Sequence, residues 1–274
     1  QRPSQWFLQK IGCPESFTEP LDLYRIARSR GMTLVTITDH NRIEGALEIA
    51  HLAGTFLSEE VTSYFPEDPC KLHVLVYQIT ESQHEDIQKL RKNVYELVNY
   101  LQRQNITHAL AHPMYAVNDR LTIEHFEKCL LLFVNFEMNG DFNPESNECL
   151  KQTLSNLNRE EIYRLADKHG LFPGFPKPWK KNLIGGSDDH SSLNIARTFT
   201  EVSSADSVDS FLHGIDDGKT KVVSQPSSPQ NFARNLYSIA YQFYRHKLGL
   251  DDYAPSDGVL KFIDRCLRTD QEAH

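Results

Sequence analysis

The chain has 274 residues, of which 39% are apolar and 10% aromatic. These fractions suit a globular protein with a substantial core and exclude a disordered chain. The formal net charge is −8, and acidic and basic residues are interspersed, so no basic face for nucleic acid stands out. No apolar run is long enough to cross a bilayer, and the length allows one large α/β domain or two small ones.

The cysteines are spread along the chain and form no CxxC pair. They are Cys13, Cys70, Cys129, Cys149 and Cys266. This spacing predicts free thiols in a reducing compartment and argues against thiolate zinc and against a disulfide framework. We therefore expect a cytoplasmic protein, although the chain begins at Gln1 without an initiator Met, so the absence of a signal peptide is weak support.

Short apolar runs alternate with segments of helical period. In chain order we expect a helix at 19–31, a strand at 34–39, a helix at 42–54, strands at 55–65 and 71–79 around a turn at 66–69, a long helix at about 81–104, strands at 106–113 and 130–137, helices at about 144–156 and 158–169, and last strands at 182–188 and 197–202. This alternation predicts an α/β fold with mainly parallel strands, either a barrel or a doubly wound sheet.

Composition also divides the chain. We expect one main domain over 1–221, a linker rich in Ser, Pro and Gln over 222–231, and a helical extension over 232–274. The aromatic helix expected at 232–250 packs more readily against the domain, or against a missing partner segment, than it forms a cofactor site.

Polar side chains follow several of the expected strands. His40, His112, Asp188 and His190 each lie at or shortly after the end of an expected strand. Ligands of parallel α/β folds bind outside the carboxyl ends of the strands, so these positions are candidate functional sites.

Glu60 and His73 need a separate argument, because His73 precedes its apolar run. If 66–69 turns the chain back on itself, Thr62 lies roughly opposite His73. Side chains alternate with period 2 along a strand, so Glu60 and Thr62 share a face and Glu59 points away. Glu60 is then the diagonal neighbour of His73, within reach of a shared ion.

Each of these polar residues alone is more often structural than functional. Together they would need separate partners at several strand ends, whereas a single cluster of divalent cations would satisfy them all. Imidazole and carboxylate without thiolate suit zinc, manganese or iron.

Five motifs, in this order, resemble the PHP family, the polymerase and histidinol phosphatase metallohydrolases. They are TDHN at 38–41, EEVTSYF at 59–65, HVLVY at 73–77, AHP at 111–113 and GSDDH at 186–190. The resemblance spans about residues 19 to 202. It implies a distorted (β/α)7 barrel, up to three divalent ions at its mouth, and hydrolysis of a small phosphorylated substrate.

The resemblance also implies ligand roles for individual residues. Glu60 would bridge two metals, and His73 and His112 would complete the shell of the second. Asp188 would bind the first metal, because the family's Asp-x-His spacing selects it over Asp189. His40 and His190 would bind the third.

Other residues would support the chemistry. Asp39 would orient a ligand histidine, as metal-bound imidazoles commonly require. The candidates for binding the substrate phosphate are Arg42, Arg120 and Arg197, since a guanidinium group can donate two hydrogen bonds to one phosphate. A surface salt bridge is an equally good expectation for each of them. The mechanism implied is two-metal hydrolysis, with in-line attack of an activated water on phosphorus.

One feature of the family is missing. Its signature opens with a His-x-His strand shortly before the first helix, and residues 1–18 contain no histidine. We expect this motif and the first barrel strand to lie upstream of Gln1, in a fused or missing segment, because a barrel without that strand exposes unpaired strand edges. Two alternatives stay open: a degenerate PHP domain that regulates or scaffolds a larger protein, and an amidohydrolase-like enzyme that cleaves C–N bonds.

Overall fold

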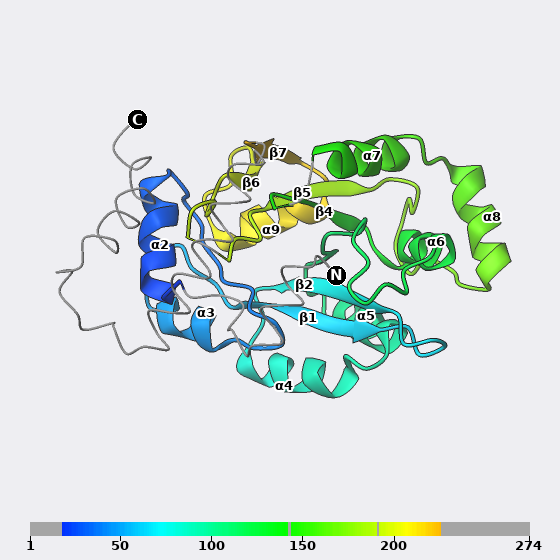
Figure 1. The fold of residues 1–274 in the computed structure, drawn as a ribbon, viewed down its shortest axis with the longest axis horizontal. Helices are drawn as coiled ribbons and strands as arrows, with labels where there is room; N and C mark the ends of the chain where they lie inside the picture. Colours follow the sequence, from blue (N-terminus) through cyan, green and yellow to red (C-terminus); the bar gives the residue numbers. More distant parts are fainter. Residues whose placement is uncertain (1–17, 142–143, 191, 226–274) are drawn as a thin grey trace, which may run out of the picture. The chain divides into compact units, whose positions relative to one another are not determined.

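The structure is a computed structural model that describes residues 18–141, 144–190 and 192–225 (Figure 1). The chain divides into two compact units, the first formed by Glu19–Asp188 and Asn194–Pro226 and the second by the remaining segments, which include Asp189–Leu193. In the second unit, the hydroxyls of Thr18 and Ser192 are hydrogen-bonded at 2.6 Å. All the helices and strands below belong to the first unit.

A mixed five-stranded sheet organises the first unit, in the order β1-β2-β3-β4-β5. Its strands are β1 (Ser58–Tyr64), β2 (Lys71–Tyr77), β3 (His108–Leu110), β4 (Asn135–Asn139) and β5 (Asn182–Gly186). β2 runs antiparallel to both β1 and β3, whereas β3, β4 and β5 are parallel. The α/β class is confirmed. The expectation of mainly parallel strands is wrong because β2 opposes both of its neighbours, and the strands of the described residues form no closed barrel.

Two further strands, β6 (Thr198–Val202) and β7 (Thr220–Ser224), form a separate antiparallel pair. β7 was not expected, and it takes in the first three residues of the predicted linker. Its β-branched run pairs residue by residue with β6, from Thr198 opposite Ser224 to Val202 opposite Thr220. Of the rest of that linker only Gln225 is described, and residues 226–231 and the predicted extension over 232–274 lie outside the described residues.

Helices fill most of the connections between strands. They are α2 (Pro20–Ser29), α3 (Glu44–Ile49), α4 (Glu81–Leu90), α5 (Val94–Arg103), α6 (Ile123–Leu132), α7 (Pro144–Ser155), α8 (Arg159–His169) and α9 (Val208–Asp216). The predicted helices at 19–31, 144–156 and 158–169 are confirmed, and α9 was not expected. None of the helices in the described residues has the length and apolarity needed to cross a membrane.

The long helix expected at 81–104 is two helices. α4 ends at Leu90 and α5 begins at Val94. The Asn93 side chain accepts a hydrogen bond from the backbone N–H of Tyr95 at 3.0 Å, so it caps the start of α5. The apolar spacing continues through this break, which is why periodicity alone missed it.

The strand expected at 130–137 is wrong in its first half. Leu130, Leu131 and Leu132 form the last turn of α6, and β4 begins at Asn135. A capping box between Thr122 and His125 starts α6 far enough upstream for its apolar face to include the three leucines. A buried helix end and a buried strand have the same apolar composition.

The segment 34–39 is extended but is not a regular strand. Val35 makes an isolated parallel bridge to Thr55, ahead of β1, and His40, directly after the segment, makes one to Glu60 of β1. The helix expected at 42–54 is confirmed only over Glu44–Ile49.

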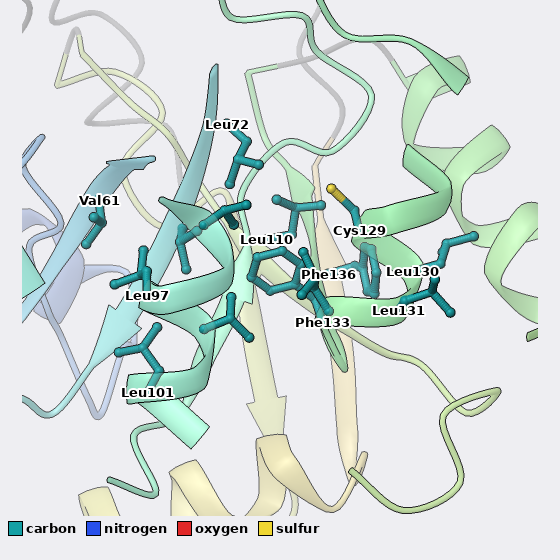
Figure 2. Packing of buried hydrophobic residues seen from close by; sticks show 14 of the residues in the cluster. Val61, Leu72, Leu97, Leu101, Leu110, Cys129, Leu130, Leu131, Phe133 and Phe136 are labelled. Atoms are coloured by element: carbon teal, nitrogen blue, oxygen red, sulfur yellow. The ribbon is translucent and has the colours of Figure 1, made fainter. Parts of the chain in front are cut away.

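The largest hydrophobic cluster lies between β1, β2 and the helices α5 and α6 (Figure 2). Leu97 and Leu101 of α5 pack beside Val61 of β1 (Figure 2). Phe133 and Phe136 fill the centre of the cluster, and both are fully buried. This packing covers one face of the sheet. The opposite face carries Glu60 and His73, and beside them Leu75 belongs to a second hydrophobic cluster with Ile184 and Leu212.

Three of the cysteines lie in the described residues, and all three are free thiols: Cys70, Cys129 and Cys149. Burial raises the pKa of the Cys70 thiol to about 11 and raises that of Cys129 as well. Both therefore behave as apolar core residues. Cys13 and Cys266 lie outside the described residues.

Phe136 tests this core. Phe136→Ala should lower the free energy of unfolding by about 3–5 kcal/mol, because it removes a fully buried ring and leaves a cavity. Ile123→Ala is the control, since Ile123 is 79% exposed, and it should change stability by less than about 0.5 kcal/mol. Chemical denaturation measures both, and equal losses would contradict the assigned core.

Candidate metal centre

The β1–β2 hairpin brings Glu60 and His73 together. Thr62 pairs with His73 and Glu60 with Leu75, which is the register that the sequence predicts. The turn is closed by a hydrogen bond from Phe65 N–H to Cys70 O at 3.0 Å, and the Asp68 carboxylate accepts the N–H of Cys70 at 3.1 Å. This short turn leaves β1 and β2 no freedom to slip.

One carboxylate oxygen is the centre of the cluster. Glu60 Oε1 lies 2.7 Å from His73 Nδ1 and 3.1 Å from His112 Nε2. The two imidazole nitrogens are themselves 3.0 Å apart. All three residues are buried, with exposed fractions of 7%, 9% and 8% for Glu60, His73 and His112. His112 comes two residues after β3, so three strands contribute to one buried triangle of ligand atoms.

His40 lies at the edge of this triangle. Its Nδ1 is 3.9 Å from Glu60 Oε1, and its ring centroid is 4.5 Å from that of His73. The neighbouring Asn41 has a left-handed backbone and exchanges two hydrogen bonds with Thr62, one through each atom of its amide. These bonds hold the segment against β1. The ligand atoms of His40, Glu60 and His73 all lie within 4.8 Å of one another.

The protonation of the cluster follows from burial and from these contacts. Burial by itself would raise the pKa of Glu60, but hydrogen bonds from His112 and His73 lower it well below its usual range. Burial by itself would lower the pKa of His112, but the hydrogen bond and the charge of Glu60 raise it to about 9. Burial lowers the pKa of His73. At neutral pH the metal-free cluster therefore holds an ionised Glu60, a protonated His112 and a neutral His73.

The donor set suits a divalent ion. Ligand atoms about 2.0–2.1 Å from a tetrahedral ion lie about 3.3 Å from each other, and the triangle of Glu60, His73 and His112 has edges of 2.7, 3.1 and 3.0 Å. One carboxylate and two imidazoles, with no thiolate, are typical ligands of zinc, manganese or iron. One proton would have to leave, from His112, and the neutral ring of His73 would have to carry its proton on Nε2 in place of the Nδ1 that now donates to Glu60.

Asp188 lies close to a second buried carboxylate that the sequence analysis missed. The amide Nδ2 of Asn139 donates to Asp188 Oδ2 at 2.9 Å and to Glu137 Oε2 at 3.2 Å. Burial and the charge of Asp188 raise the pKa of Glu137 to about 7. The signal was available, because Asn135, Glu137 and Asn139 are polar residues at period 2 that alternate with apolar residues along the strand.

The other predicted site residues make fewer described contacts with the cluster of Glu60, His73 and His112. The backbone O of Asp39 accepts from Glu60 N at 3.2 Å, and the Asp39 carboxylate lies against Gly45 at the start of α3. Arg120 donates to Asp68 O in the hairpin turn, Arg42 is exposed and Arg197 is partly buried. No described contact joins these three guanidinium groups to the cluster. His190 belongs to the second compact unit, so its role stays a prediction.

Two other acid–base residues have structural roles. Glu59 points away from the cluster, as predicted, and its carboxylate meets His84 Nδ1 at 2.9 Å and Gln88 Nε2 at 2.8 Å. His108 is the first residue of β3, the strand that precedes His112, and its Nδ1 lies 2.7 Å from the backbone O of Ile106.

Comparison with family models finds no match. Among curated proteins, the chain is 38% identical over 52 residues to an uncharacterized protein of Methanocaldococcus jannaschii, and the match covers 19% of this chain and 30% of that protein. The chain thus spans less than a third of the curated relative that it matches.

Three solved structures resemble the fold. A candidate metal-dependent phosphoesterase of Bifidobacterium adolescentis has a TM-score of 0.41 and 15% identity, over 65% of this chain and 84% of that chain. PsfC of Pseudomonas syringae has a TM-score of 0.46 and 12% identity, over 82% and 88%. The lesion-specific endonuclease PfuEndoQ of Pyrococcus furiosus has a TM-score of 0.47 and 12% identity, over 77% and 54%.

The raised pKa of His112 predicts a pH dependence of the metal-free protein. Its contribution to stability is complete below the ordinary pKa of 6.5 and is lost as the pH rises through about 9. In chelator-treated protein, the stability advantage of wild type over His112→Asn should therefore shrink between about pH 7 and pH 9, by up to about 3 kcal/mol. Denaturation at several pH values measures this difference, and parallel curves for the two proteins would contradict the assignment.

Proposed function

We propose that this chain holds at least one divalent ion at Glu60, His73 and His112 and belongs to a PHP-type metal-dependent hydrolase of phosphoesters. The observation that carries the proposal is the buried triangle of one carboxylate and two imidazoles, with edges close to 3 Å. The order of the sequence motifs supports the family, and the net charge of −8 favours a small phosphorylated substrate over nucleic acid.

The residues of the cluster have distinct tasks. A bound divalent ion, whether zinc, manganese or iron, would supply Lewis acidity and lower the pKa of a water. Glu60 stays ionised and offers negative charge, and His73 offers a neutral ring. His112 gives up the proton on Nε2, which Glu60 Oε1 accepts as a hydrogen bond until that proton leaves for solvent. Because the cluster is buried, the charges of Glu60 and His112 interact in a low-dielectric interior, where electrostatic interactions are stronger than in water.

The finer features of the family are part of the same proposal. Asp188 would serve a first ion and His40 a third. Asp39 would orient a ligand, and Arg42, Arg120 and Arg197 would reach the phosphate when substrate is bound. Free thiols at Cys70 and Cys129 favour a cytoplasmic site of action.

Metal binding tests the choice of carboxylate. Glu60→Gln should weaken manganese or zinc binding by more than about 100-fold, beyond the usual effect of losing an outer-shell partner. Glu59→Gln is the matched control, because Glu59 is the adjacent buried carboxylate on the other face of β1. It should lower stability and leave metal affinity within a few-fold of wild type. Titration against a chelating dye measures both, and equal losses would mean that the wrong carboxylate was chosen.

Turnover tests the reaction class. We expect phosphomonoesters or phosphodiesters, and no amides, to be cleaved with added manganese or zinc. A longer natural chain with His-x-His upstream should be far more active than these 274 residues, because the first ion otherwise keeps only Glu60 and Asp188. Equal rates for both lengths would contradict the metal assignment. Metal binding without turnover at either length would favour a regulatory module, and cleavage of amides would favour a C–N hydrolase.

A further inference from the structure

Two ligand candidates, His112 and Asp188, lie where the sheet no longer holds the chain. Each comes two residues after the end of its strand, β3 at Leu110 and β5 at Gly186. Both have left-handed backbones, with φ of 30° and 45°. Residues other than glycine rarely adopt this conformation, and it persists only where neighbouring groups impose it.

β4 lies between these two strands, and its side chains are the groups that hold His112 and Asp188 in this conformation. Glu137 and Asn139 are two residues apart, so their side chains share a face of the strand. Glu137 Oε2 accepts the backbone N–H of His112 at 3.0 Å and one N–H of Asn139 at 3.2 Å. Asn139 donates also to Asp188 Oδ2 at 2.9 Å. A continuous chain of hydrogen bonds thus joins His112 to Asp188 through two side chains of β4.

The direction of this chain is determined by its surroundings. Asn139 Oδ1 accepts the backbone N–H of Asp141 at 2.9 Å, so Nδ2 faces the two carboxylates. The backbone of Asn139 is held by Asn147, which accepts its N–H and donates to its carbonyl O at 2.8 Å. Gly186 makes room for the acid, since a Cβ there would collide with Glu137 Oε1.

We propose that Glu137 and Asn139 are positioning residues that set the distance and orientation of His112 and Asp188 for metal binding. The inference rests on the metal centre proposed above. Partners that orient metal ligands typically contribute about 10- to 100-fold to metal affinity. Neither residue needs to touch the ion, because the acceptor oxygen of Glu137 and the donor nitrogen of Asn139 are used by the ligands.

The same strand offers a matched control. Asn135 is also a buried asparagine of β4, at the opposite end, where it donates to His108 O and to Asp216 Oδ1, both at 3.0 Å. Asn135→Ala removes a comparable buried polar network without contact to the cluster. It should lower the unfolding midpoint and leave the dissociation constant for Mn²⁺ unchanged.

The experiment compares dissociation constants for Mn²⁺, measured by competition with a chelating dye, and unfolding midpoints of the metal-free proteins. Asn139→Ala should weaken Mn²⁺ binding about 10- to 100-fold. Glu137→Leu should do the same, whereas Glu137→Gln keeps an acceptor oxygen for the two N–H groups and should bind within a few-fold of wild type. The unfolding midpoints identify any variant that fails to fold. If Asn139→Ala fails to fold, the comparison of Glu137→Leu with Glu137→Gln decides the question.

Wild-type affinity in Asn139→Ala or in Glu137→Leu would overturn the positioning role and leave the metal centre intact. Equal losses of affinity in Asn139→Ala and Asn135→Ala would also overturn it, because the effect would then be one of general stability. No Mn²⁺ binding by the wild-type protein would overturn the metal centre itself and this role with it.

Discussion

The buried carboxylate of Glu60 is the group around which the rest of the site is arranged. An ionised carboxylate is costly to bury unless hydrogen bonds and opposite charge compensate it. Here the compensation comes from His73 on the paired strand and from His112 beyond β3. The hairpin register and the end of β3 must therefore both be correct before Glu60 can be buried. A slip of one residue in β1 would turn Glu60 outward and bring Glu59 into its place.

The two adjacent glutamates show how strongly surroundings decide the chemistry of identical groups. Glu59 meets one imidazole and one amide on the helix-covered face of β1, and burial raises its pKa in spite of them. Glu60 meets two imidazoles, and its pKa is lowered. The first arrangement anchors α4 through His84 and Gln88. The second keeps Glu60 ionised against a protonated His112.

β4 joins its two neighbours, β3 and β5, at both ends of the strand. At its start, Asn135 and Asp216 tie β3 and β5 to the end of α9 through hydrogen bonds of about 3.0 Å. At its end, Glu137 and Asn139 reach the residues that follow the same two strands. Between them Phe136 points into the core. One five-residue strand thus sets the spacing of its neighbours at both ends, and this rigidity suits a site whose ligands come from separate strands.

Local sequence determined the parts of this protein that depend on near neighbours. The period-2 pattern and the short turn were enough to place Glu60 diagonal to His73, because an antiparallel hairpin has one register once its turn is set. Helices α2, α7 and α8 are predicted from their periodicity, because helical hydrogen bonds and side-chain contacts join residues three or four positions apart. The capping box at Thr122 and His125 likewise begins the helix that includes the apolar run at 130–132, a run whose composition is compatible with a helix or a strand. Tertiary structure alone decided the contacts between strands. The approach of His112 to Glu60 and the bridge from Glu137 to Asp188 join residues 25 to 52 positions apart. No local pattern encodes such contacts, since they arise only when the strands lie side by side in the sheet.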